Sequence, residues 1–152
     1  MADPNPISLR NGEAARILHL VGGDTLRAFE LVERQLTTLV LRAQVMLSLC
    51  GIVVTVTGFS GRSIAQTSNL ARLSIAAGIL IVLASAAVAM WGVLRLRWFT
   101  QELDDEPLVT LRRGLAIRDR KAAWLARALA LFIVGFGCYC FAIAQLLLAA
   151  SP

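Results

Sequence analysis

Three long apolar stretches without a single charged side chain constrain the fold of this chain more than any other feature. They cover residues 43–61, 73–94 and 128–150. A charge-free apolar stretch of about 18 or more residues is long enough to cross a hydrocarbon layer about 30 Å thick as a helix. The sequence therefore predicts an all-α integral membrane protein with three transmembrane helices.

The overall composition agrees with a membrane protein. The 152 residues are 57% apolar and 16% charged, whereas soluble domains contain about 25% charged residues. We expect residues 1–23 to form an N-terminal segment with a short helix, and residues 24–152 to form a single three-span membrane domain. A sizeable soluble domain within these 152 residues is not expected.

Basic residues are distributed unevenly between the segments that join the apolar stretches. Thirteen of the 15 lysines and arginines precede the first stretch or lie between the second and the third, and only Arg62 and Arg72 lie between the first and the second. The positive-inside rule makes the richer side cytoplasmic, so we expect the N-terminus inside and the C-terminus outside. All ten acidic residues lie on that side too. The small excess of positive charge that remains on that side favours anionic lipid headgroups over nucleic acid as a partner.

The helix that contains the first apolar stretch is predicted to begin well before that stretch. A short helix is expected over residues 12–21, capped by Asn11 or Ser8, and Gly22–Gly23 should end it. Asp24 should cap a second helix. Apolar residues then recur at three- and four-residue steps, so residues 24–60 predict one helix, amphipathic at its start and apolar at its end. Glycines and polar residues at 58–62 should end this helix, and a short outer loop should follow over residues 62–69.

The second stretch is rich in small residues that share a helix face. Ser74 and Gly78 are four residues apart, as are Ser85 and Ala89. Small faces let helix backbones approach closely in lipid. We therefore expect helix packing through Ser74, Gly78, Ser85 and Ala89, either inside the bundle or in an oligomer. Trp91 and Trp98 should mark the inner membrane surface, beyond which the helical pattern continues through Leu103.

An acidic triplet and a proline predict the start of the last helix. Asp104, Asp105 and Glu106 precede Pro107, and acidic residues and proline are both favoured in a first helical turn. A divalent-ion or partner contact is the alternative role of the triplet. A leucine pattern then runs into the third span without a breaker. The fold class is thus three transmembrane helices with long amphipathic cytoplasmic helical extensions.

A basic cluster lies in the extension that precedes the third span. It comprises Arg112, Arg113, Arg118, Arg120 and Lys121. Such a cluster is either a solvated face close to the membrane that maintains the topology, or a contact for lipid headgroups or another anion.

The sequence offers little for catalysis, metal binding or transport. His19 is the only histidine, and residues 22–25 lack the lysine and the spacing of a phosphate loop. No nucleophile–base pair is visible, so we expect no enzyme, no catalytic residue, no metal and no cofactor. The spans lack the charged groups typical of transporters, although a pore lined by hydroxyl and small residues remains possible.

The order of these parts resembles the small bacterial transmembrane effectors of nucleotide-signalled antiphage systems, the Pycsar transmembrane and SLATT-type groups. The resemblance covers residues 24–150. It is most sequence-like at Arg118-Asp119-Arg120-Lys121-Ala122-Ala123-Trp124-Leu125-Ala126-Arg127-Ala128, which runs directly into the last apolar stretch. It implies an antiviral defense protein that oligomerises in the inner membrane and impairs it. This chain departs from the pattern because it carries no nucleotide-sensing domain.

Two functions remain open at this stage. The first is an oligomerising inner-membrane effector that forms pores or otherwise impairs the membrane. The second is a structural or accessory subunit that docks on a cytoplasmic or membrane protein partner through its helical extensions.

Overall fold

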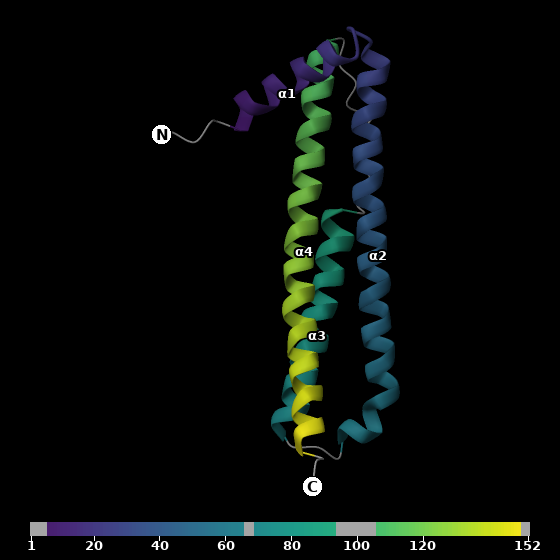
Figure 1. Ribbon diagram of the computed structural model, residues 1–152, viewed down its shortest axis with the longest axis vertical. Helices are drawn as coiled ribbons and strands as arrows, with labels where there is room; N and C mark the ends of the chain where they lie inside the picture. The colour runs from purple at the N-terminus through teal and green to yellow at the C-terminus, as the bar shows by residue number, and fades with distance from the viewer. Residues whose placement is uncertain (1–5, 66–68, 94–105, 150–152) are drawn as a thin grey trace.

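The computed structural model describes residues 6–65, 69–93 and 106–149, together with their side chains except at 6–10, 60–65 and 146–149. Within these ranges the chain forms four helices and no strand (Figure 1). Their bounds are α1 Pro6–Leu20, α2 Thr25–Ala65, α3 Asn69–Gly92 and α4 Pro107–Ala149.

Three of the helices are long and apolar enough to cross a membrane, namely α2, α3 and α4. Their apolar segments bury only 22–28% of their residues inside the protein, and large side chains such as Leu80 and Ile133 are exposed along them. Exposed apolar surface on that scale is typical of a lipid-facing protein. Over the described residues, the prediction of an all-helical fold with three helices able to cross a membrane is confirmed.

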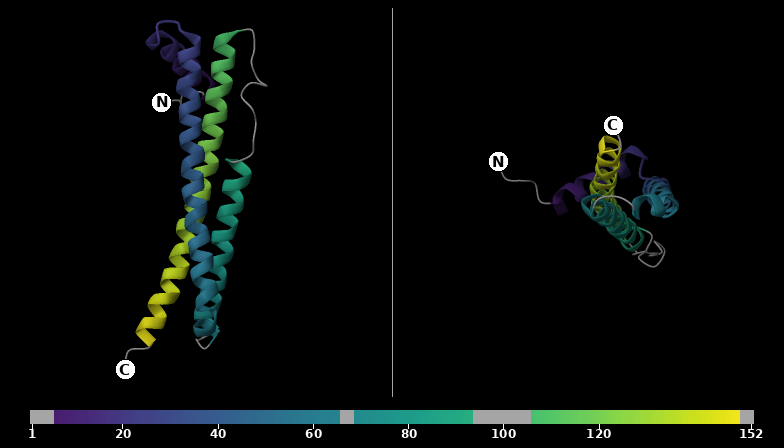
Figure 2. Two further views of the ribbon diagram at one scale, coloured as in Figure 1. Left: turned by 90° about the vertical axis from the view of Figure 1, so that its right-hand side faces the viewer. Right: turned by 90° about the horizontal axis from the view of Figure 1, so that it is seen from below.

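Helices α2 and α4 lie side by side and run far beyond the described end of α3 (Figures 1 and 2). They contain 41 and 43 residues, against 24 in α3. At 1.5 Å per residue these lengths are about 60 Å, 65 Å and 36 Å. Helix α1 lies across the end of the α2–α4 pair that is farthest from the C-terminus. The described residues therefore form a three-helix membrane half and an outer half that contains α1 and the first parts of α2 and α4.

The buried residues form separate clusters along this length. The outer cluster joins all three helices of the outer half and consists of Ala14, Ala28, Val32, Leu111 and Leu115. Three smaller clusters follow in the membrane half, around Met46, Ala89 and Ala128, around Cys50, Val53 and Val82, and around Ile75, Tyr139 and Ala142.

Several predicted helix boundaries are confirmed. Gly22 and Gly23 have φ angles of 68° and 83° and end α1, a backbone conformation that glycine adopts without steric strain. The Asp24 carboxylate accepts hydrogen bonds from the backbone N–H groups of Leu26 and Arg27, at 3.0 and 3.2 Å, and so caps α2. Helix α4 begins at Pro107, as predicted.

Two other boundaries were predicted wrongly. Helix α1 begins at Pro6, so neither Ser8 nor Asn11 is its cap. Proline suits the first helical position because it lacks an N–H that would in any case be unpaired there. Helix α2 continues to Ala65 instead of ending within residues 58–62. A single glycine costs a helix only about 1 kcal/mol relative to alanine, and unpaired backbone groups cost more at a membrane.

Some predictions fall outside the described residues. Helix α3 ends at Gly92, and its predicted continuation through Trp98 to Leu103 lies outside them, as do Asp104 and Asp105 of the acidic triplet.

Candidate functional site

Two helix backbones come into close contact in the membrane half at a crossing of two glycines, Gly78 of α3 and Gly135 of α4. A Cβ atom built on Gly78 would lie 2.9 Å from the Gly135 carbonyl oxygen, and one built on Gly135 would lie 2.9 Å from the Gly78 carbonyl oxygen. Real Cβ atoms essentially never approach that closely. The two backbones can therefore meet only because neither residue has a side chain.

The same seam between α3 and α4 contains a hydrogen bond between helices. The Ser85 hydroxyl is fully buried and donates to the Ala128 carbonyl oxygen at 2.7 Å. One turn further on, Ala89 is buried against Met46 and Ala128. Of the four residues predicted for helix packing, Gly78, Ser85 and Ala89 thus contact other helices of the same chain, while Ser74 is half-buried.

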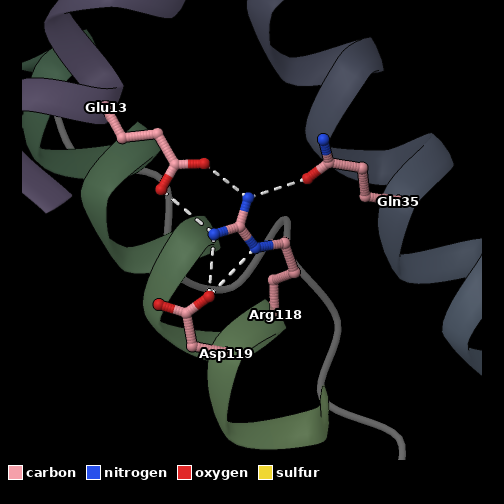
Figure 3. A network of polar contacts seen from close by, with 4 residues as sticks. All are labelled: Glu13, Gln35, Arg118 and Asp119. Carbon is pink, nitrogen blue, oxygen red and sulfur yellow. Dashed lines mark hydrogen bonds and ion pairs between the residues drawn. The ribbon is translucent and has the colours of Figure 1, made fainter.

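Arg118 is the centre of a polar network that ties the outer half together (Figure 3). Its guanidinium donates to both carboxylate oxygens of Glu13 on α1, at 2.6 and 3.1 Å. It also donates to the Gln35 amide oxygen on α2 at 3.0 Å, and twice to Asp119 at 3.0 and 2.8 Å. One arginine of α4 therefore holds α1 and α2 at the same point.

The network uses the whole hydrogen-bonding capacity of Arg118. An arginine has five N–H donors, and five hydrogen bonds leave this one. Its side chain is only 20% exposed. The hydrogen bonds to Glu13, followed by those to Asp119, raise the pKa of Arg118 above its already high ordinary value. Arg118 is therefore always charged, and its N–H groups are already occupied within the chain.

The remaining cations of the predicted basic cluster do not converge on one site. Arg112, Arg113 and Arg120 are exposed, whereas Lys121 is half-buried and burial lowers its pKa. At about 100° per residue, Lys121 and Arg118 lie about 180° and 240° around the helix from Arg112. The five cations are thus spread over most of the circumference of α4.

A groove between α2 and α4 lies beside this network, at the level where the first apolar stretch begins. Its volume is about 300 Å³, and it is lined by Gln35, Thr38, Leu39, Arg42, Arg118 and Ala122. The α2 residues are spaced i, i+3, i+4 and i+7, so they share one helix face. Glu13 and Gln35 were not identified from the sequence, whereas Arg42 was expected at the entry of the first span, where its side chain can reach the lipid headgroups. The seven-residue spacing of Gln35 and Arg42 places both on one helix face, and this pattern can be recognised in the sequence. Nothing local in the sequence links Glu13 to Arg118, 105 positions away.

Aromatic and basic side chains lie together at the end of the membrane half that adjoins the outer half. The Arg127 guanidinium stacks over the Trp124 ring at 5.2 Å from its centroid, and Trp124 contacts Gly92 at the end of α3. Trp91 is 70% exposed. Tryptophan and arginine are typical of the boundary between hydrocarbon and headgroups. The positions of Trp91, Trp124, Arg127 and Arg42 therefore agree with one membrane surface at this level.

Helix α2 exposes a line of small and polar residues within its membrane segment. This small polar stripe consists of Gln44, Ser48, Gly51, Thr55 and Gly58, all of them exposed. The Ser48 and Thr55 hydroxyls donate to carbonyl oxygens of their own helix, at 3.1 and 2.8 Å. The spacing of four and three residues keeps the stripe within an arc of about 80°.

Among the described residues, no group of three or more His, Cys, Asp or Glu side chains is arranged to hold a metal ion. His19 is exposed at the end of α1.

No protein-family model, no curated protein and no solved structure matches this chain.

Proposed function

We propose that this protein is an oligomerising membrane protein without enzymatic activity that impairs the membrane, by forming a pore or by disturbing the bilayer. The resemblance to Pycsar transmembrane and SLATT-type effectors supports an antiviral defense role in a bacterial inner membrane. The charge distribution supports an orientation with the N-terminus in the cytoplasm and the C-terminus on the opposite side of the membrane. The half named outer, because it lies beyond the membrane half, is then on the cytoplasmic side. The outer half then forms the cytoplasmic extension of the spans.

One observation carries the oligomer proposal, namely the exposed small polar stripe of α2. The predicted packing face on α3 is already turned toward α4 at Gly78 and Ser85, so it is not free for a second copy. The stripe of α2 contacts nothing in the described chain across Gly51 and Gly58, where a Cβ atom would meet no atom within 4 Å. Small residues on a lipid-facing helix favour close association with another helix.

The same stripe suits a membrane-impairing assembly. Copies that associate around their α2 helices would bring rings of hydroxyl, amide and glycine groups together from Gln44 to Gly58. Such groups can line a narrow aqueous path without any charged residue, and apolar neighbours can gate it by dewetting. The proposal therefore requires no ionisable group inside the spans.

Leakage of dye-filled liposomes and growth of cells on induction test this function together. We expect the full chain to release dye and to arrest growth. Gly51→Leu should reduce both effects strongly, because its side chain would keep the stripes of two copies apart. Gly137→Leu is the matched control, since Gly137 is also exposed in a span with nothing within 4 Å of its Cβ position. Intact liposomes and healthy cells with the unmodified chain would contradict the proposal.

A structural or accessory subunit of a larger membrane complex is the second candidate. The observation that favours it is the pair Leu20 and Leu26, which are 82% and 69% exposed on either side of the Gly22–Gly23 turn, outside the spans. Apolar side chains at such a tip suit docking on another protein. Purification in mild detergent would then recover a different protein in fixed ratio, which a homo-oligomer would not.

A further inference from the structure

We infer that the groove between α2 and α4 binds the phosphate group of an anionic phospholipid, with Arg42 as the main ligand. The position, the charge and the shape of the groove each fit the headgroup of an anionic lipid.

The groove lies at the right depth for a lipid headgroup. Arg42 is the last charged residue before the apolar segment of α2, and Gln35 lies seven residues earlier. Seven residues of helix cover about 10 Å, and the headgroup layer is about 5 to 8 Å thick on each side of the hydrocarbon. The Trp124–Arg127 pair is typical of the same boundary on α4, and its members lie two and five residues beyond Ala122 of the groove. A headgroup is therefore the molecule that normally occupies this level.

The charge of the groove lining is entirely positive. Its two ionisable residues are Arg42 and Arg118, and neither Glu13 nor Asp119 is among the six lining residues. Arg42 is exposed and forms no ion pair with any residue that the structure describes. Its register is unusual for an arginine beside lipid, because Met46 and Val53, four and eleven residues further on, are buried against the other helices. Arg42 therefore faces the mouth of the α2–α4 seam instead of the open bilayer.

The Arg118 network prepares a second donor for the anion. Arginine can only donate hydrogen bonds, so Gln35 must turn its amide oxygen toward Arg118, as the 3.0 Å contact shows (Figure 3). The amide nitrogen of Gln35 then remains as a donor in the groove lining. The Thr38 hydroxyl already donates to the Arg34 carbonyl oxygen at 2.9 Å, and the charge of Arg118 is balanced by Glu13 and Asp119. The phosphate would therefore be held by Arg42 and Gln35.

The volume and the apolar part of the lining fit a lipid better than a free ion. About 300 Å³ exceeds what one phosphate group fills and lies at the lower end of ligand pockets. Leu39 and Ala122 provide apolar walls beside the cations, and exposed Leu49 and Leu129 continue apolar surface into the membrane half. A phosphate with a glycerol backbone above acyl chains matches this order of surfaces.

Native mass spectrometry of the full chain in detergent, titrated with phosphatidylglycerol and with phosphatidylcholine, tests the inference. We expect phosphatidylglycerol to bind at least about tenfold more tightly than phosphatidylcholine. Arg42→Gln should remove about tenfold of that affinity, the usual effect of losing a charge-assisted hydrogen bond. Arg34→Gln is the control, because it makes the same change of charge on an exposed position of α2 that does not line the groove.

A second variant blocks the groove without changing any charge. Ala122→Met should fill it and weaken phosphatidylglycerol binding to a similar extent, while circular dichroism and thermal unfolding confirm that all variants fold. Inorganic phosphate at millimolar concentration should not displace the lipid. Equal losses in Arg42→Gln and Arg34→Gln, an unchanged affinity in Ala122→Met, or displacement by inorganic phosphate would each overturn the inference.

Discussion

The two halves of this molecule are held together by different physical means. In the outer half, α1, α2 and α4 bury medium and large apolar side chains such as Val32, Leu111 and Leu115, and the Arg118 network joins the three helices. In the membrane half, α3 and α4 approach most closely where the bare backbones of Gly78 and Gly135 meet, and apolar side chains such as Val82 and Ile75 are buried beside that contact.

The contrast agrees with the proposed placement of the outer half in water and of the membrane half in lipid. Burial of leucine and valine is favourable where the alternative is water, so a large-residue core and ion pairs suit the outer half. In lipid, a leucine side chain gains little by leaving one apolar environment for another. Close van der Waals packing and buried hydrogen bonds, such as that of Ser85, then provide the association energy. The change from one mode to the other occurs at Arg42 and Trp124.

The largest effect should follow from making a cavity in the outer cluster. Leu115 is fully buried there, and Leu115→Ala should lower the free energy of unfolding by about 2 to 5 kcal/mol. Denaturant titration of the purified protein in detergent, followed by circular dichroism, measures the loss. Leu26→Ala, at a position that is 69% exposed, should change the stability by less than about 0.5 kcal/mol. Similar losses in both variants would mean that the outer half has no water-excluded core.

Enlarging a residue at the glycine crossing should have the next largest effect. Gly135→Leu would force α3 and α4 apart and should lower the stability by about 1 to 3 kcal/mol. Gly137→Leu, two residues away with open space around it, should be nearly neutral. Thermal unfolding of both variants in lipid nanodiscs compares them directly. Tolerance of leucine at both positions would refute the close backbone approach.

Removing the carboxylate that binds Arg118 should release α1 with a smaller effect. Glu13→Gln keeps the shape of the side chain but loses the ion pair, and we expect a loss of about 1 to 2 kcal/mol at low salt. The effect should shrink at high salt because the Glu13 side chain is 39% exposed. Proteolysis between α1 and α2 reports the release, and Glu33→Gln on the exposed face of α2 is the charge-matched control. A cleavage rate that equals that of the control would show that α1 is held by its apolar contacts alone.

The smallest effect should come from the hydrogen bond between α3 and α4. Ser85→Ala should cost about 0.6 kcal/mol, the average for such bonds in membranes. Ser48→Ala removes a hydroxyl that bonds only to its own helix and should cost less. A loss of several kcal/mol at Ser85, measured by the same unfolding assay, would show that polar contacts dominate the membrane half.

Local signals in the sequence were sufficient for most of the fold. The charge-free stretches predicted the three spans, and Gly22–Gly23, Asp24 and Pro107 predicted helix boundaries, because each acts on backbone groups within a few residues. The two wrongly predicted helix boundaries, near Pro6 and Gly58, also arise from reliance on local signals. A proline can begin a helix as well as precede one, and a glycine breaks a helix only where the environment allows unpaired backbone groups.

The candidate sites could be predicted only in part. Small residues in the second span were identified, but their partners, Gly135 and the Ala128 carbonyl group, depend on how α3 crosses α4. The basic cluster was identified as a set, yet Arg118 is occupied by Glu13 and Gln35, and the exposed cation of the groove is Arg42 on another helix. Contacts between residues 43 to 105 positions apart leave no local pattern in the sequence.

The mass of the protein in native nanodiscs excised directly from the cell membrane tests the central claim, that this chain assembles with itself in a membrane. We expect particles that contain several copies of the 16.4 kDa chain, and a shift toward single copies in Gly51→Leu but not in Gly137→Leu. Particles that hold one copy of the unmodified chain, alone or with a different protein, would contradict it.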